Sequence, residues 1–306
     1  MKTLKSWWIL LIVFVTFLGC GQQSGDSGKS KETRETEETE AMSSEASKPE
    51  LISKWSTDTV MRVPESVCYD PVEEVLYVAN IQGNPTEKDG KGFISKLSTD
   101  GEVLEHKWVS GLDAPKGMGV HNGMLYVTNI DEIAQIDIEE GEIVNRYACP
   151  GAQFANDIDI NEAGVVFASD MTADKIYRLE QGEVETWLES DMLNGPNGLY
   201  ATSGHLMIGI EGAVLKVPYE GGTPQTYISN TGGIDGLKAV EKDGYYIKSD
   251  WTGHVHLIPP DRQKQLILDT TGDDINAADI EFVPELGMLY VPTFHDNRVM
   301  AYALKM

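Results

Sequence analysis

The sequence predicts an all-β fold, a six-bladed β-propeller whose blades are four-stranded antiparallel sheets. Short runs rich in β-branched and aromatic residues alternate with turns that contain Gly, Asn or Asp, and no long apolar stripe of helical period follows residue 50. One short pattern also recurs six times, at intervals of about forty residues. A repeat of this length, holding several short strands, is typical of propeller blades.

The repeated pattern is a polar motif followed by a β-rich run. We expect each copy to begin the innermost strand of a blade. The copies lie at residues 64–67, 115–118, 155–158, 196–199, 234–237 and 277–280. The first interval is longer because residues 82–91, rich in Gly, Asn, Pro and charged residues, insert a loop.

The two ends of the ring are expected to meet in the last blade. That blade contributes β-rich runs at residues 280–282, 288–291 and 298–304, and so lacks a fourth strand. Residues 52–60 have no blade of their own, and we expect them to pair as the outer strand of the last blade, which removes an exposed sheet edge. The alternatives are a β-sandwich and an open solenoid, but an open array would need distinct capping repeats, which are not evident.

Residues 1–20 have the features of an export signal. Two Lys residues precede an apolar run of about a dozen residues, which is short for a transmembrane helix but typical of a signal sequence. The run ends at Leu18-Gly19-Cys20, which resembles a bacterial lipobox. We expect Cys20 to be acylated, giving an exported protein that a lipid anchors in the bacterial cell envelope, facing the periplasm or the surface. A plain secretory signal and an uncleaved anchor helix are the alternatives.

Residues 21–50 carry few large apolar side chains and a Glu-rich cluster, so we expect a disordered acidic tether, followed by the propeller at residues 51–306. The chain has a formal net charge of −25 and no basic patch, which argues against nucleic-acid binding. Three Cys residues exclude a disulfide-stapled scaffold, although Cys68 and Cys149 could pair outside the cytosol. His254 and His256 alternate on one predicted strand, as a metal pair or as packing residues. We expect a monomer.

Equivalent positions of the repeat should form a ring of side chains at the mouth of the central channel. The members of this ring are Glu65, Lys116, Asn156, Asn197, Asp235 and Ala278, of which the first five are polar or charged. The next position is Gly in three copies, which allows close backbone packing or the approach of a ligand. Carboxylate and amide oxygens suit calcium or magnesium better than zinc, so the ring predicts a divalent-metal site, with calcium the first choice. A hydrated, purely structural mouth is the alternative.

In their order, these motifs resemble those of the senescence-marker-protein, gluconolactonase and luciferin-regenerating-enzyme family. The resemblance covers about residues 61–304 and depends on the Glu of the first repeat, the Asn-Asp of the third, the Pro-Asn-Gly of the fourth and the Asp-Gly of the fifth. It implies a divalent ion in the channel, bound by Glu65, Asn197 and Asp235. It also implies that Asn156 contacts the ligand or the metal.

The resemblance further implies the hydrolysis of a small lactone or ester. The ion would act as a Lewis acid, Asp235 as the general base toward water, and Asn156 as a contact to the substrate or the developing oxyanion. Lys116 could pair with Glu65 and compete with calcium, could steer an anionic substrate and stabilise an oxyanion, or could extend its ammonium into solvent. The alternative function is that of a non-catalytic propeller lipoprotein of the NHL type, which binds a ligand or a protein partner.

A few other residues bear on the same mouth. His205 and His295 lie near strand ends and are candidates to line the channel. Trp251 follows a predicted strand and is a candidate to line the mouth. Asp170 and Asp250 end predicted strands, and we expect them to hydrogen-bond turns rather than to catalyse.

Overall fold

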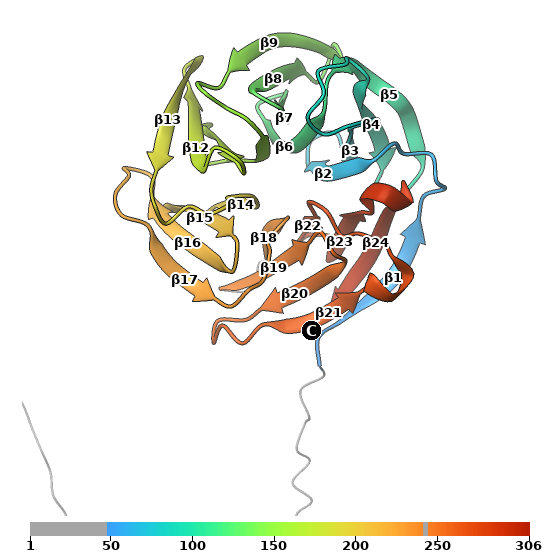
Figure 1. The fold of residues 1–306 in the computed structure, drawn as a ribbon. Coiled ribbons are helices and arrows are strands. Elements are labelled where there is room, and N and C mark those ends of the chain that lie inside the picture. The colour runs from blue at the N-terminus through green and yellow to red at the C-terminus, as the bar shows by residue number, and fades with distance from the viewer. Residues whose placement is uncertain (1–47, 241–243) are drawn as a thin grey trace, which may run out of the picture. The chain divides into compact units, whose positions relative to one another are not determined.

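The computed structural model describes residues 48–240 and 244–306, and within these residues the all-β prediction is confirmed. Twenty-four strands of the described chain form six four-stranded sheets, and its helices are two 3-10 turns, η1 (Thr271–Asp273) and η2 (Phe294–Asp296). Figure 1 shows the sheets as blades around a central axis; the first strand along the chain is innermost in five blades, and β22 is innermost in the sixth. The six-bladed propeller expected from the repeat is therefore the observed fold.

Five blades use four consecutive strands each, ordered from the axis outward. Blade 1 contains β2 (Pro64–Asp70), β3 (Val75–Asn80), β4 (Gly92–Ser98) and β5 (Val103–Leu112). Blade 2 contains β6 (Pro115–His121), β7 (Met124–Asn129), β8 (Glu132–Asp137) and β9 (Glu142–Ala148). Blade 3 contains β10 (Ala155–Ile160), β11 (Val166–Asp170), β12 (Lys175–Glu180) and β13 (Glu183–Glu189). Blade 4 contains β14 (Leu199–Ala201), β15 (His205–Ile210), β16 (Ala213–Pro218) and β17 (Gln225–Ser229). Blade 5 contains β18 (Leu237–Val240), β19 (Tyr245–Asp250), β20 (His254–Ile258) and β21 (Gln265–Asp269).

The sixth blade joins the two ends of the described chain. It contains β22 (Glu281–Val283), β23 (Met288–Pro292), β24 (Val299–Lys305) and, outermost, β1 (Glu50–Ser56). Strand β1 pairs antiparallel with β24, so the predicted closure is confirmed, although the strand begins and ends earlier than the expected residues 52–60. The predicted signal sequence, Cys20 and the tether up to residue 47 lie outside the described residues. Within the described ranges, no helical segment has the length and apolar character needed to cross a bilayer.

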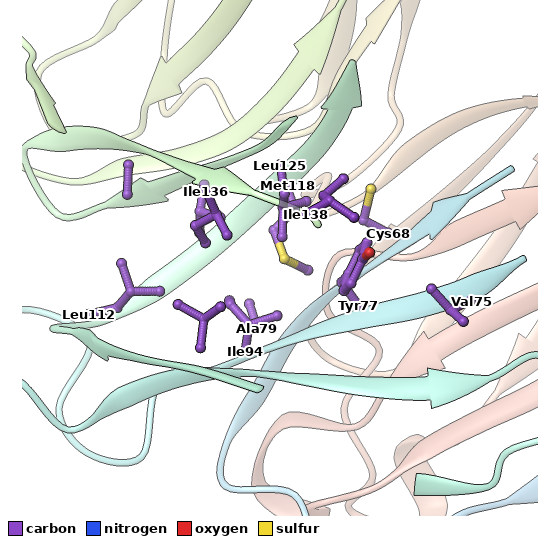
Figure 2. Packing of buried hydrophobic residues seen from close by; sticks show 13 residues of the cluster. Cys68, Val75, Tyr77, Ala79, Ile94, Leu112, Met118, Leu125, Ile136 and Ile138 are labelled. Atoms are coloured by element: carbon purple, nitrogen blue, oxygen red, sulfur yellow. The ribbon is translucent and has the colours of Figure 1, made fainter. Parts of the chain in front are cut away.

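The hydrophobic core lies between neighbouring blades. Figure 2 shows one such cluster, in which Tyr77 and Ile94 of blade 1 face Met118, Leu125 and Ile136 of blade 2. Strand β3 is buried along its whole length, whereas the outer strand β9 has only exposed and half-buried positions. Adjacent blades cover both faces of β3, whose side chains are mostly apolar. The two Cys residues of the described chain are buried free thiols, and no disulfide joins them.

The glycines beside the predicted ring are required for close packing of the inner backbones. A Cβ atom built on Gly198 would lie 2.4 Å from the backbone oxygen of Asp235, and one on Gly236 would lie 2.5 Å from the backbone nitrogen of Ile280. Both distances are shorter than any real Cβ contact. Backbone packing, rather than the approach of a ligand, therefore explains why Gly follows the ring residue in these copies of the repeat.

Hydrogen bonds between blades hold the inner ring together. The hydroxyl of Ser249 donates to the backbone oxygen of Ala278 at 2.7 Å, and the hydroxyl of Thr128 donates to the backbone oxygen of Asn156. The backbone N–H of Asp279 donates to the backbone oxygen of Glu65 at 2.9 Å, joining the last blade to the first. Because these bonds run between blades, the ring positions are set by the closed fold.

Candidate functional site

The five polar residues of the predicted ring line one pocket at the end of the channel where the inner strands begin. The pocket has a volume of about 540 Å³. Its polar base is formed by Glu65, Lys116, Asn156, Asn197 and Asp235. Residues that are far apart in the chain thus meet in one place, as the repeat predicts. The sixth ring position, Ala278, is buried and does not line the pocket.

Two of the pocket residues precede their strands rather than begin them. Asn197 and Asp235 lie before β14 and β18, in short segments that still bond to the second strand of the same blade. The N–H of Asn197 donates to the oxygen of Gly209 at 2.9 Å, and that of Asp235 donates to the oxygen of Ser249 at 3.0 Å. These bonds fix both side chains at the mouth even though the regular strand starts later.

Several oxygen atoms at the base of the pocket have no partner. The amide nitrogen Nδ2 of Asn197 donates to Oδ1 of Asp235 at 3.0 Å, which leaves the amide oxygen of Asn197 free. That oxygen, Oε2 of Glu65 and Oδ1 of Asn156 are buried and accept no hydrogen bond from the described residues. Buried polar atoms without a partner are rare and costly, so this group of oxygens calls for a ligand that the protein does not supply.

The two carboxyl groups of the base resist ionising together. Burial raises the pKa of Glu65 well above its ordinary value, and the charge of Asp235 raises it further. Burial raises the pKa of Asp235 to about 7, against the hydrogen bond from Asn197, which lowers it. A cation between such groups would offset both effects by favouring the ionised forms.

Lys116 lies beside this oxygen set. Its Nζ donates to the backbone oxygens of Ala114 at 3.1 Å and Pro85 at 3.2 Å, and lies 4.3 Å from the ring centre of Phe154. Among the described residues no carboxylate lies within 4.0 Å of this nitrogen. Burial lowers the pKa of Lys116 to about 8, against the charge of Glu65, which raises it. With 1% of its surface exposed, Lys116 does not extend into solvent, so that alternative is wrong.

The wall of the pocket is apolar and was largely missed by the sequence analysis. It is formed by Ile81, Pro85, Phe154, Met171, Trp251 and Phe294, with His295 beside them. A usable signal does exist, because the residue that follows the second strand of a blade points to the mouth in three blades. Those residues are Ile81 after β3, Met171 after β11 and Trp251 after β19. Of this set, Trp251 alone was predicted to lie at the mouth.

The structure also places the other residues that were predicted to lie near the mouth or to bond turns. His295 lines the pocket, whereas His205, at the start of β15, does not. Asp170 accepts hydrogen bonds from four backbone N–H groups, two of them in the segment that holds Phe154, which confirms its expected role in turns. Asp250 accepts from the side chain of Thr252, in the turn that follows β19, as expected, and also from the side chains of Lys248 and His254.

The base of the pocket fits a hard divalent cation. Two carboxylates and two amide oxygens meet there, three of the four groups carry a buried unpartnered oxygen, and such ligands are those that calcium prefers. Within the described residues no group of three or more His, Cys, Asp or Glu side chains is placed to hold a metal ion. Binding at this place would therefore depend on the amide oxygens of Asn156 and Asn197 as much as on the carboxylates.

No protein-family model matches this sequence, and no curated protein matches it. Solved structures share the fold. A gluconolactonase from Xanthomonas campestris is 19% identical, with a TM-score of 0.60 over 83% of this chain and 87% of that chain. A streptogramin B lyase is 14% identical, with a TM-score of 0.59 over 84% and 98%. A catalytically inactive histidine-to-alanine variant of virginiamycin B lyase from Staphylococcus aureus, with quinupristin, is 13% identical, with a TM-score of 0.58 over 84% and 99%. At these identities the likeness concerns the propeller fold.

Proposed function

We propose that this protein is a lipid-anchored hydrolase of a small lactone or ester that uses a divalent metal, calcium first, at the base of the pocket. The observation that carries the proposal is the set of buried unpartnered oxygens on Glu65, Asn156 and Asn197 beside the carboxylate of Asp235. The repeat by itself brings these four side chains to the mouth, and what favours a cation over a merely hydrated mouth is that three of them hold buried oxygens without a partner.

The proposed reaction is the addition of water to a carbonyl group. A cation held by Glu65, Asn197 and Asp235 supplies Lewis-acid polarisation of the carbonyl and a lower pKa for water. Asp235 takes a proton from the attacking water as the water oxygen bonds to the carbonyl carbon. The bond to the leaving oxygen then breaks, and that oxygen receives the proton from Asp235. The products are a carboxylic acid and an alcohol, joined in one molecule when the substrate is a lactone.

Burial raises the pKa of Asp235 to about 7 when no cation is present. A cation bound beside it would lower that pKa, so the carboxylate would be ionised at neutral pH and able to accept the proton of water. Asn156 and Lys116 lie at the same base and can donate to the carbonyl oxygen as its negative charge develops. The fixed ammonium of Lys116 therefore serves as a substrate contact in this proposal.

The test is hydrolysis by the full chain of a panel of lactones and esters, with calcium and with a chelator. We expect calcium-dependent turnover that Asp235→Asn lowers by at least about a hundredfold, the usual scale for a general base. Asp58→Asn, which changes an exposed carboxylate that does not line the pocket, is the control and should keep full activity. A calcium-loaded protein that hydrolyses none of these compounds contradicts the proposal and leaves a ligand-binding propeller.

A lyase reaction is the second candidate, because His295 also lines the pocket. Two structural neighbours are lyases, and one of them is inactive as a histidine-to-alanine variant. Elimination at an ester gives a carboxylic acid and an alkene without consuming water, whereas hydrolysis gives an acid and an alcohol. The mass of the product separates the two reactions, and loss of activity in His295→Ala with an alkene product would favour the lyase.

The lipid anchor at Cys20 is part of the proposal. Labelled fatty acid fed to cells should be incorporated into the full chain and should be absent from Cys20→Ala. Incorporation into both chains, or into neither, would contradict the anchor. This result does not depend on whether the pocket is catalytic.

A further inference from the structure

The wall of the pocket includes an aromatic platform, which consists of Trp251, Phe294 and His295 from blades 5 and 6. Trp251 is 45% exposed, although it is a large apolar side chain. The ring of Trp251 meets Phe294 with centroids 5.6 Å apart and His295 at the same distance, both nearly edge to face. The three rings therefore adjoin one another at steep angles, so a flat group can stack on one of them, Trp251, while the other two border it.

This platform is held in place by the backbone. Nδ2 of Asn276 donates to the backbone oxygen of Trp251 at 2.9 Å, and Oδ1 of Asn276 accepts from the N–H of His295 at 3.4 Å. One buried amide thus ties both segments that carry the rings. A fixed aromatic surface binds a flat partner without first losing conformational freedom.

Other elements form the rest of the wall. The backbone N–H of Phe154 donates to the carboxylate of Asp170 at 3.1 Å, which fixes this residue. The ammonium of Lys116 lies over its ring, 4.3 Å from the ring centre. The loop inserted in blade 1 contributes Pro85, whose oxygen accepts a bond from Lys116. The same loop is joined to blade 2 by the ion pair of Lys88 and Asp131 at 2.6 Å. Phe154 and the inserted loop with Pro85 thus form another part of the wall.

The wall has few groups that could replace the hydration of a polar substrate. Among the described residues that line the pocket, the only polar groups outside the oxygen set are the ammonium of Lys116, the imidazole of His295 and the indole N–H of Trp251. Two hydrogens of Lys116 are already used by backbone oxygens. A ring with several hydroxyl groups would lose hydrogen bonds to water on entering, with little in exchange.

We infer that the pocket selects a lactone or ester that carries a flat apolar group, such as a phenyl ring, and few hydroxyl groups. The apolar group lies against Trp251 and Phe294 while the carbonyl reaches the oxygen set at the base. The reaction in this inference rests on the proposed function, whereas the preference for an apolar group rests on the residues of the wall.

The experiment compares three six-membered lactones on the full chain with calcium: δ-valerolactone, δ-phenyl-δ-valerolactone and glucono-δ-lactone. We expect kcat/KM to be highest for the phenyl compound and lowest for the gluconolactone. Trp251→Ala should lower kcat/KM for the phenyl compound about tenfold, which is the scale of one aromatic contact. Its effect on kcat/KM for δ-valerolactone should be much smaller. Trp251→Phe should restore most of kcat/KM for the phenyl compound. Leu266→Ala, which removes an exposed apolar side chain on an outer strand, is the control.

A second readout does not need turnover. Phenylpentanoate should change the tryptophan fluorescence of the wild type and not that of Trp251→Phe, whereas pentanoate should do so only at far higher concentration. A preference for gluconolactone overturns the inference and leaves the hydrolase proposal standing. No hydrolysis together with selective phenylpentanoate binding overturns the hydrolase proposal and supports the apolar site. Hydrolysis of the plain and phenyl lactones at equal rates, with no Trp251 effect, overturns the inference.

Discussion

Asn197 of blade 4 donates its amide nitrogen to the carboxylate of Asp235 in blade 5, at 3.0 Å. This one bond sets the orientation of the amide, because the oxygen must then point away from Asp235. The free oxygen of Asn197 is buried in the same pocket as Glu65. A contact between neighbouring blades therefore prepares the proposed ligand set before any ligand arrives.

Replacing this amide by a carboxylate should make the protein depend on calcium. In Asn197→Asp, a third acidic group joins Glu65 and Asp235 and loses the hydrogen bond, so like charges repel in a buried place. We expect a lower Tm than wild type without calcium and a larger calcium-induced increase. Thermal melts with calcium and with a chelator measure both. An unchanged response to calcium would show that no ion is bound here.

Calcium should stabilise the wild-type protein. At a free concentration of about a hundred times Kd, binding to the folded state alone adds about 2.7 kcal/mol. For a domain of this size that corresponds to an increase in Tm of about 5–10 °C. Glu65→Gln should raise the calcium concentration needed for this increase in Tm at least tenfold, because it removes one charge from the site. An equal response in Glu65→Gln would contradict the assignment of Glu65.

The calcium-free protein should lose stability as the pH rises. Burial raises the pKa of Asp235 to about 7 from an ordinary value of 3.8, and that of Glu281 to about 7 from 4.5. The folded state thus binds more protons than the unfolded chain between these limits, so the free energy of unfolding falls from about pH 4 to about pH 7. Denaturant melts across this range test the sign. Glu281→Gln should flatten the slope and leave the calcium response intact.

A methyl group added to the inner ring should disrupt the site. Gly198→Ala places a Cβ 2.4 Å from the backbone oxygen of Asp235. We expect a loss of about 1–3 kcal/mol in the free energy of unfolding, together with weaker calcium binding, because the displaced backbone carries Asp235. Gly204→Ala is the matched control, since nothing lies within 4 Å of its Cβ position. Equal stability of the two variants would show that the inner backbones are not tightly packed.

Lys116 should contribute to turnover rather than to metal binding. Lys116→Met keeps the length of the side chain but removes the charge held near the carbonyl, and we expect kcat/KM to fall about tenfold or more. The calcium-induced increase in Tm should persist. Lys305→Met removes only an exposed ion pair, with Glu50 on the outer strands of blade 6, and is the control. Full activity in Lys116→Met would exclude the substrate contact.

The convergence of Glu65, Asn197 and Asp235 could be predicted because a propeller places equivalent residues of each repeat at equivalent distances from one axis. The period and the motif therefore suffice to group them. The roles of these residues as metal ligands, and that of Asp235 as a base, stay predictions that calcium and turnover must test. The lipid anchor at Cys20 also stays a prediction.

The apolar wall could be predicted only in part. The position after the second strand of a blade identifies Ile81, Met171 and Trp251, but Phe294 lies beyond that position, and an apolar side chain after a strand is more often core than surface. Whether Lys116 faced the carboxylates or turned aside depended on the backbone oxygens of Ala114 and Pro85, the second of which belongs to the inserted loop.

The order and spacing of the residues were enough for the fold, its closure by β1 and the membership of the polar base, since these follow from local β-structure repeated around an axis. Packing between blades decided the orientation of the Asn197 amide, the state of the buried charges and the apolar character of the wall. These properties arise from contacts between segments whose separation in the chain carries no information about the direction in which a side chain points.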